Sequence, residues 1–187
     1  MQYAIVAFPV FDAAAAIESV RCRFDPLASM LPAHVTLVFP FTDVVGEADL
    51  AKHVARTLED HPVFDIALSD VTVEDGGYVL LNVETGANVL STLHDRLYGG
   101  LLASHLSSAH EYRPHVTIGR LPDDEQARSA AAQAILHLVL PLLGKINDVA
   151  LFRLSEDGSG DVALTIGLKP DSARPASDVQ SSSPVKT

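Results

Sequence analysis

His34-Val35-Thr36-Leu37 and His115-Val116-Thr117-Ile118 are two copies of one tetrapeptide, His-apolar-Thr-apolar, in a chain of 187 residues. Shuffling a chain of this composition would produce only about 0.1 copy of such a motif. The repeat therefore needs a physical explanation. Two histidines in matched settings suggest one acid and one base.

Each copy has the pattern of a β-strand with one polar and one apolar face. Side chains alternate along a strand, so His and Thr share one face and the two aliphatic residues share the other. Pro32 and Pro114 precede the copies and favour extended backbone at the entry. The alternative for a single copy is a half-exposed strand without a site, because Thr is a good strand former. The repeat favours a cleft that carries both histidines.

The flanks of the two copies, P-A-H-V-T-L-V-F-P-F and Y-R-P-H-V-T-I-G-R, strengthen a resemblance to a known family. The chain resembles the 2H phosphoesterase superfamily, which contains the 2'-5' RNA ligase-like proteins and small cyclic nucleotide phosphodiesterases. The signature of that family is two H-h-T-h motifs, where h is apolar. The resemblance implies a two-lobed, pseudo-symmetric α+β fold with antiparallel sheets, in which the two His-x-Thr strands face a central cleft. It also implies metal-independent hydrolysis of a small or RNA-terminal 2',3'-cyclic phosphate or of a 2'-5' phosphodiester.

Hydrophobic periodicity predicts strands that alternate with helices. In chain order we expect a strand at 3–9, a helix at 13–23 capped by Asp12, a strand at 34–39, a helix at 46–60, a hairpin of 64–73 and 78–84, a helix at 87–98, a strand at 115–120, a helix at 123–139, and strands at 147–155 and 161–168. Two successive blocks of strand, helix and motif strand are consistent with a duplicated lobe.

Length and composition predict one domain over residues 1–168, followed by a disordered tail at 169–187 that has few apolar residues. No apolar run reaches 18 residues, which argues against a membrane span. The N-terminus lacks a basic start and is interpreted as a strand instead of a signal peptide. Cys22 is the only cysteine, so an internal disulfide is excluded. We expect Cys22 to be buried in the first helix and the protein to be cytoplasmic.

The net charge of −11 at pH 7 restricts the partners. Affinity for duplex nucleic acid comes largely from many phosphate contacts made by Lys and Arg, and an acidic surface repels a long polyanion. We therefore expect no extended nucleic-acid surface. We also expect a monomer and no membrane partner. Its partner would be a small cyclic phosphate or nucleotide, or the end of an RNA strand.

The candidate catalytic residues are His34, Thr36, His115 and Thr117. Hydrolysis of a cyclic phosphate needs a base for water and an acid for the departing ribose oxygen, and imidazole can do either near neutral pH. The two threonine hydroxyls would donate hydrogen bonds to the non-bridging oxygens. Which histidine is the base stays open.

Five more residues are candidates for substrate binding. Arg113 and Arg120 flank the second copy, and Arg suits bidentate phosphate contact. The alternative for each is a surface ion pair. Tyr112, Phe39 and Phe41 lie next to the copies and could stack on a base, although the core is an alternative place for the two phenylalanines.

No metal and no cofactor are expected. The stretch from His110 to His115 resembles H-E-x-x-H but is one residue too long, and Pro114 would break the helix that aligns such ligands. Structural roles are expected for His53, His61, His94 and His137.

Two alternatives to hydrolysis remain, namely a binding module for nucleotides or RNA ends without turnover, and an RNA 2'-5' ligase. Two titratable groups in matched motifs favour an enzyme over a binding module.

Overall fold

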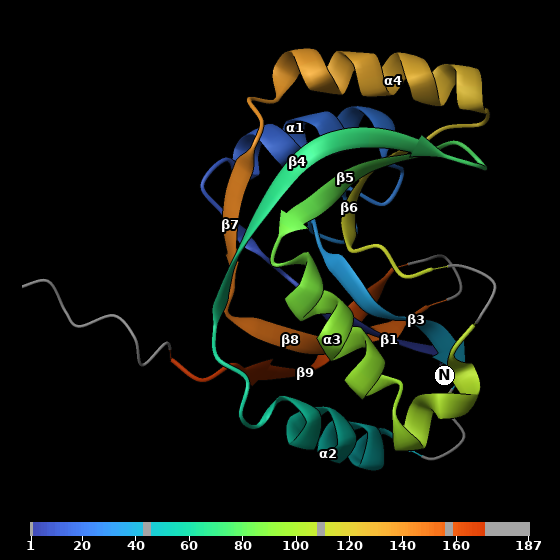
Figure 1. Cartoon of the computed structure of the whole chain (residues 1–187). Coiled ribbons are helices and arrows are strands. Elements are labelled where there is room, and N and C mark those ends of the chain that lie inside the picture. Colours follow the sequence, from blue (N-terminus) through green and yellow to red (C-terminus); the bar gives the residue numbers. More distant parts are fainter. Residues whose placement is uncertain (1, 43–45, 108–110, 156–158, 171–187) are drawn as a thin grey trace, which may run out of the picture.

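One antiparallel sheet of nine strands organises the molecule, with strand order β2-β7-β4-β5-β6-β3-β1-β8-β9 (Figure 1). The computed structural model describes residues 2–42, 46–107, 111–155 and 159–170. His110 and positions 171–187 of the predicted tail lie outside the described residues. Within the described residues, every pair of neighbouring strands in the sheet is antiparallel, which confirms the predicted α+β fold with an antiparallel sheet.

The elements follow the predicted order, with two additional short strands. The strands are β1 (Gln2–Ala7), β2 (Val10–Phe11), β3 (Val35–Thr42), β4 (Phe64–Glu74), β5 (Tyr78–Thr85), β6 (His115–Arg120), β7 (Leu142–Ile146), β8 (Asp148–Leu154) and β9 (Gly160–Gly167). The helices are α1 (Ala14–Phe24), α2 (Glu47–Leu58), α3 (Ala87–Leu97), α4 (Asp124–His137) and a 3-10 helix (Gly100–His105).

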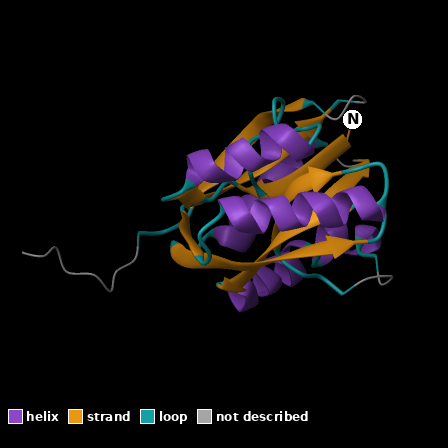
Figure 2. Ribbon diagram, turned by 90° about the horizontal axis from the view of Figure 1, so that it is seen from above, coloured by secondary structure: helices purple, strands orange, loops and turns teal. Residues whose placement is uncertain are grey.

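The sheet divides into two lobes where β3 meets β6, because the pairing of these strands, in the part of the chain that the structure describes, is limited to Val35 opposite Val116. We call β3, β1, β8 and β9 the first lobe and β6, β5, β4, β7 and β2 the second lobe. The helices are exchanged between the two sequence blocks. Helix α1, from the first block, packs on β6, while α3, from the second block, packs on β3 (Figure 1). Figure 2 shows helices and strands packed together in the view from above.

The hydrophobic core lies on the face of the sheet that carries both motif valines. Ile17 and Val20 of α1 and the alanines of α4 fill it in the second lobe, while Leu50 of α2 and Leu90 of α3 fill it in the first. These helices therefore cover one face of each motif strand and leave its other face to the site. Within the described residues, no helix is both long enough and apolar enough to cross a membrane.

Local structure corrects two expectations in the first helix. Asp12 does not cap α1, because its backbone N–H donates to the Leu143 carbonyl at 3.2 Å and the chain is still paired with β7 there; Ala13 is the N-cap residue. Cys22 is exposed instead of buried. Its neighbour Arg21 occupies the inward position and is only 1% exposed.

The short strands β2 and β7 were not predicted. They pair through Phe11 and Gly144 at one edge of the sheet. A Cβ atom on Gly144 would lie 2.5 Å from the Phe11 ring, so this strand position requires glycine. Near the other end of the chain, the Lys169 N–H donates to the His61 carbonyl at 2.9 Å, and the Lys169 carbonyl accepts from the Val63 N–H at 2.8 Å. Backbone hydrogen bonding to the folded body therefore continues as far as Lys169.

Candidate active site

The two tetrapeptides are neighbours at the centre of the sheet. Val35 of β3 lies opposite Val116 of β6, and both valines are fully buried. In an antiparallel pair, the residue before one valine faces the residue after the other, so the histidine of each tetrapeptide faces the threonine of the other. We call the surface that carries His34, Thr36, His115 and Thr117, all half-buried, the His/Thr face.

Both imidazole rings are held by the same local hydrogen bond. Nδ1 of His34 lies 2.9 Å from the Pro32 carbonyl, and Nδ1 of His115 lies 2.7 Å from the Arg113 carbonyl, in each case two residues earlier in the chain. A carbonyl oxygen only accepts, so Nδ1 must donate. In both rings Nε2 is therefore the nitrogen left to take up or release a proton at a bound substrate.

Burial lowers the pKa of both histidines below the ordinary value of 6.5, because it disfavours the charged imidazolium. For His34, the hydrogen bond to Pro32 opposes this shift, Arg21 adds to it, Asp25 opposes it, and the charge of His115 adds to it. For His115, the hydrogen bond to Arg113 and the carboxylate of Glu74 oppose the shift. His34 thus has two charged neighbours of opposite effect, Arg21 and Asp25, whereas His115 has the carboxylate of Glu74.

The hydroxyl groups of Thr36 and Thr117 are available to a ligand. Each side chain is half-buried on the His/Thr face, and neither hydroxyl has a hydrogen-bond partner within the described residues. Hydroxyl groups in this position can donate to the oxygens of a phosphate held between the two rings.

The strand pairing slips by one residue at the last position of each tetrapeptide. In β3 the slip separates Thr36 from Val38, and in β6 it separates Thr117 from Gly119. Such a β-bulge re-aims the side chains that follow it. A Cβ atom on Gly119 would lie 3.1 Å from Cβ of Phe24, so glycine lets the end of α1 approach the bulge of β6.

The bulges bring the residue five positions after each histidine back to the His/Thr face. In β6 this residue is Arg120, which lies opposite Tyr78 with its guanidinium 5.1 Å from the ring centroid. In β3 it is Phe39, which is 47% exposed, while Val38 and Phe41 point into the core. The two lobes thus place an arginine and an aromatic ring at equivalent positions.

Phe41 does not line the site. Its side chain is 5% exposed and its ring contacts those of Tyr3 and His105. The prediction that Phe41 binds substrate is therefore wrong, because the second irregularity in the pairing of β1 with β3 returns Phe41 to the core face.

Tyr112 has both a structural contact and a position beside the site. Its hydroxyl donates to the Thr36 carbonyl at 2.9 Å, and its ring stacks on His94 with centroids 3.8 Å apart. Nδ1 of His94 lies 2.8 Å from the Leu37 carbonyl, and the Tyr98 hydroxyl accepts from the Phe39 N–H at 3.1 Å. These three side chains hold β3 where it diverges from β6. A structural role was expected for His94, whereas Tyr98 was not predicted from the sequence.

A buried ion cluster holds the segment that leads into the first tetrapeptide. Arg21 donates to Asp25 at 2.7 Å, to Glu18 at 2.9 Å and to the Leu31 carbonyl at 2.8 Å. Glu18 also accepts from the Ala33 N–H at 2.8 Å, directly before the first histidine. This cluster was not predicted from the sequence, where the available signal was the spacing of Glu18 and Arg21 on one helix with Asp25 directly after its last residue.

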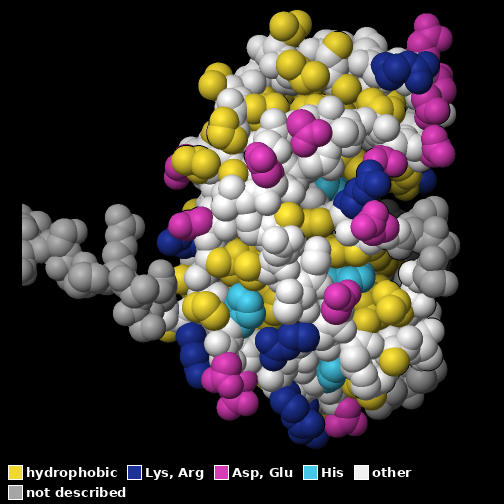
Figure 3. Space-filling view, in the orientation of Figure 1, with side chains coloured by type: hydrophobic (Ala, Val, Ile, Leu, Met, Phe, Trp, Pro, Cys, Tyr) yellow, Lys and Arg dark blue, Asp and Glu magenta, His cyan; other side chains and the backbone are white. Residues whose placement is uncertain are grey.

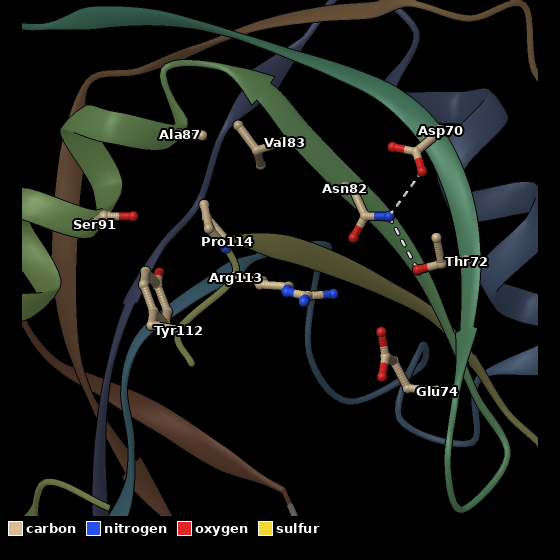
Figure 4. Close-up of a pocket in the computed structure, with 10 residues that line it drawn as sticks. All are labelled: Asp70, Thr72, Glu74, Asn82, Val83, Ala87, Ser91, Tyr112, Arg113 and Pro114. Carbon is tan, nitrogen blue, oxygen red and sulfur yellow. Dashed lines mark hydrogen bonds between the residues drawn. The ribbon is translucent and has the colours of Figure 1, made fainter. Parts of the chain in front are cut away.

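A cavity of about 440 Å³ adjoins the His/Thr face on the side of the second lobe (Figure 4). Its lining residues are Asp70, Thr72, Glu74, Asn82, Val83, Ala87, Ser91, Tyr112, Arg113 and Pro114. Tyr112 and Arg113 were predicted near the site; the residues from β4 and β5 were missed, because alternation does not reveal which face of a hairpin meets the motif strands. Arg113 also lies 3.9 Å from Glu111, and both side chains are exposed.

Charged groups are interspersed on the face seen in Figure 3, where basic side chains stand beside acidic ones. Within ranges 2–42, 46–107, 111–155 and 159–170, no three His, Cys, Asp or Glu side chains group together in a way that could hold a metal ion.

Comparisons with known proteins show the family of the chain. Residues 9–158 match the family model of the 2'-5' RNA ligase superfamily. A protein of Geobacillus thermodenitrificans named "Putative phosphoesterase" is 33% identical over 131 residues, which cover 68% of this chain and 74% of that protein. A Bacillus pumilus protein of the same name is 30% identical over 138 residues, covering 68% and 75% of the two chains.

Solved structures share the fold at low sequence identity. The crystal structure of TT0787 of Thermus thermophilus aligns with a TM-score of 0.64 and 16% identity, covering 91% of this chain and all of that one. Escherichia coli LigT in apo form aligns with a TM-score of 0.56 and 17% identity, covering 89% and 98% of the two chains. The chain is thus similar to these proteins over almost the whole of its described length.

Proposed function

The chain belongs to the 2'-5' RNA ligase superfamily, and we propose on this basis that it hydrolyses a small or RNA-terminal 2',3'-cyclic phosphate or a 2'-5' phosphodiester by two-histidine acid–base catalysis. One observation carries the proposal. His34 and His115 lie on one face of adjoining strands, each opposite the other's threonine, and each has its Nδ1 engaged so that Nε2 is available.

In the proposed reaction, Nε2 of one histidine takes a proton from water as the water oxygen attacks phosphorus. Nε2 of the other histidine gives its proton to the departing ribose oxygen as the phosphorus–oxygen bond breaks. The hydroxyls of Thr36 and Thr117 donate to the non-bridging oxygens, where negative charge increases. After one turnover the two protons have changed places, and exchange with solvent restores them.

The two residues that the bulges return to the His/Thr face suit the rest of the substrate. Arg120 supplies a cation for the phosphate, and Phe39 supplies an exposed ring on which a base can stack. Escherichia coli LigT, which shares this fold, has been crystallised with 3'-AMP and with ATP, and these complexes support a nucleotide-sized ligand.

The function is tested by a turnover panel in EDTA. The panel contains 2',3'-cyclic nucleotides, ADP-ribose cyclic phosphate and 2'-5' dinucleotides. We expect hydrolysis of at least one class without added metal. Turnover that appears only after addition of Zn²⁺ or Mn²⁺ would contradict the two-histidine mechanism, and binding without turnover of any compound would identify a binding module instead.

The pH profile of kcat/KM should be a bell whose maximum lies below pH 6.5. One histidine must be neutral and the other protonated, so the maximum lies midway between the two coupled pKa values of the free enzyme. Burial lowers both pKa values from 6.5, which moves both limbs towards acid pH. The measurement is hydrolysis of the best substrate in EDTA from pH 4 to 9, and a single sigmoidal limb would exclude a second titrating group.

Replacing Thr36 or Thr117 by valine should lower kcat by about 10- to 100-fold, the range expected for loss of a hydrogen bond to a charged group. The melting temperature should change little, because valine keeps the strand shape and neither hydroxyl bonds to another described residue. Thr165→Val on β9 is the matched control. Unchanged kcat in both active-face variants would remove the threonines from the mechanism.

A further inference from the structure

The His/Thr face changes from polar to apolar along a single row of residues that crosses six strands. Strand pairing connects each member of this row to the next, except that His115 and Thr36 are placed opposite each other by the pairing of their neighbours Val116 and Val35. From β4 to β8 the row is Asp70, Asn82, His115, Thr36, Val6 and Ala150. The two lobes are related by pseudo-symmetry in their backbone, but the row is polar on the second-lobe side of the histidines and apolar on the first-lobe side.

The first-lobe side of the row is apolar. Val6 and Ala150 belong to a small cluster with Ala4, Leu31 and Phe152, and Phe8 packs against it beside the His34 ring. Such a surface provides no hydrogen bonds from its side chains. It suits a flat, apolar part of a ligand.

The second-lobe side of the row is formed by the cavity of about 440 Å³. Hydrogen bonds fix the orientation of the Asn82 side chain in its lining. The Asn82 amide nitrogen donates to Asp70 Oδ2 at 3.2 Å and to Thr72 Oγ1 at 3.0 Å (Figure 4). Both amide hydrogens are therefore used on the β4 side. The amide oxygen of Asn82 faces away from β4 and is available as a hydrogen-bond acceptor next to His115.

Acceptors dominate the cavity. Besides Asn82, the carboxylates of Asp70 and Glu74 line it, and Figure 4 shows Arg113 extending towards the Glu74 side. Carboxylates and an amide oxygen accept hydrogen bonds from hydroxyl groups, and the two carboxylates outnumber the single guanidinium of Arg113, so the net charge of the lining disfavours a phosphate. A cavity of this chemistry suits an uncharged group that carries several hydroxyls.

The spacing of the strands places this chemistry at the distance of one sugar from the reacting phosphorus. Neighbouring strands lie about 5 Å apart, so Asn82 is about one such step and Asp70 about two steps from His115 along the row. When a phosphate lies at the two histidines, the hydroxyl groups of a ribose bonded to it through oxygen lie within the same one to two strand spacings.

We propose that this cavity is a specificity subsite that accepts the ribose hydroxyls of a nucleoside attached to the reacting phosphate and rejects a second phosphate on that nucleoside. The proposal rests on the proposed function, because it names the substrate part that lies beside the two histidines. Asp70 and Glu74 determine the preference, with Asn82 positioned by Asp70 and Thr72. The enzyme then selects the terminal linkage of a chain that ends in an unphosphorylated ribose.

The test compares three 2'-5' dinucleotides that differ only at the terminal nucleoside, which carries a free 2',3'-diol, no hydroxyls, or a 3'-phosphate. Dissociation constants are measured by calorimetry on a His34→Ala background, which keeps the ligands intact. The variants are Asp70→Asn, Glu74→Gln and both together. The control is Glu59→Gln with Asp65→Asn, which makes the same change of charge at two exposed carboxylates outside the cavity.

We expect the diol compound to bind about 10-fold more tightly than either of the other two compounds when the cavity is intact. The double cavity variant should reduce both ratios to about 3-fold or less, while the control keeps them. Equal affinity for diol and dideoxy compounds, or ratios that change alike in cavity and control variants, would overturn the subsite, as would no binding of any of the three.

Hydrolysis of 2',3'-cyclic nucleotides by the unsubstituted protein, which needs no second nucleoside, is measured in parallel. Discrimination among the three ligands without any turnover would overturn the proposed function and leave the subsite standing. Turnover without discrimination would overturn the subsite and leave the proposed function standing.

Discussion

His34→Ala and His115→Ala should each lower kcat by about 10²- to 10⁴-fold, the range that a positioned general acid or base contributes. Both side chains are half-buried on the His/Thr face, and their ring hydrogen bonds are local, to carbonyls two residues earlier. The fold should therefore be preserved. The measurement is kcat on the best cyclic phosphate, together with the melting temperature of each variant.

The double variant should lose little more activity than either single variant, because the two rings act in one chemical step and such losses are not additive. His137→Ala is the matched control, since His137 is exposed on α4 and its Nδ1 contacts only the Gln133 carbonyl of its own helix. Near-normal kcat in both single variants would refute the mechanism.

Replacing Arg21 by methionine should destabilise the protein by about 3–5 kcal/mol, which lowers the melting temperature by about 10 °C. Methionine fills similar volume but leaves Asp25, which is buried, and Glu18, which is half-buried, without their cation. Arg21 also holds the Leu31 carbonyl, so the segment before the first tetrapeptide loses its anchor. Unfolding is followed by calorimetry and by urea titration.

Arg23→Met is the control for this change. Arg23 lies two residues further along the same helix and donates a hydrogen bond to Gln133 on the surface. Its loss should cost well under 1 kcal/mol. Equal melting temperatures for the two variants would mean that the buried cluster does not stabilise the fold.

The sequence predicted the central elements well because their patterns are local. The alternation within each tetrapeptide places His34 and Thr36 on one face of a strand, and the observed burial follows it. The strand at 115–120 is found at the predicted residues. Helix α4 begins one residue later than predicted, because Asp123 is its N-cap and accepts from the Gln126 N–H at 2.8 Å.

The surroundings of the motifs could not be predicted because they depend on register. Whether Arg120 points to the site is decided by a slip of one residue opposite Val79, and the sequence does not specify a bulge uniquely. The same uncertainty made Phe41 a wrong candidate. Asp70 and Glu74 reach the site only because the β4–β5 hairpin pairs with the second motif strand, a contact between distant parts of the chain.

The exchange of helices between the two sequence blocks has a consequence for folding cooperativity. Helix α1 covers β6 and α3 covers β3, so a fragment that ends after the first block would expose the apolar face of its own motif strand. Neither block can complete a hydrophobic core by itself, and separated fragments would need each other to bury their valines. The two lobes should consequently unfold in a single transition, despite their appearance as a duplicated pair.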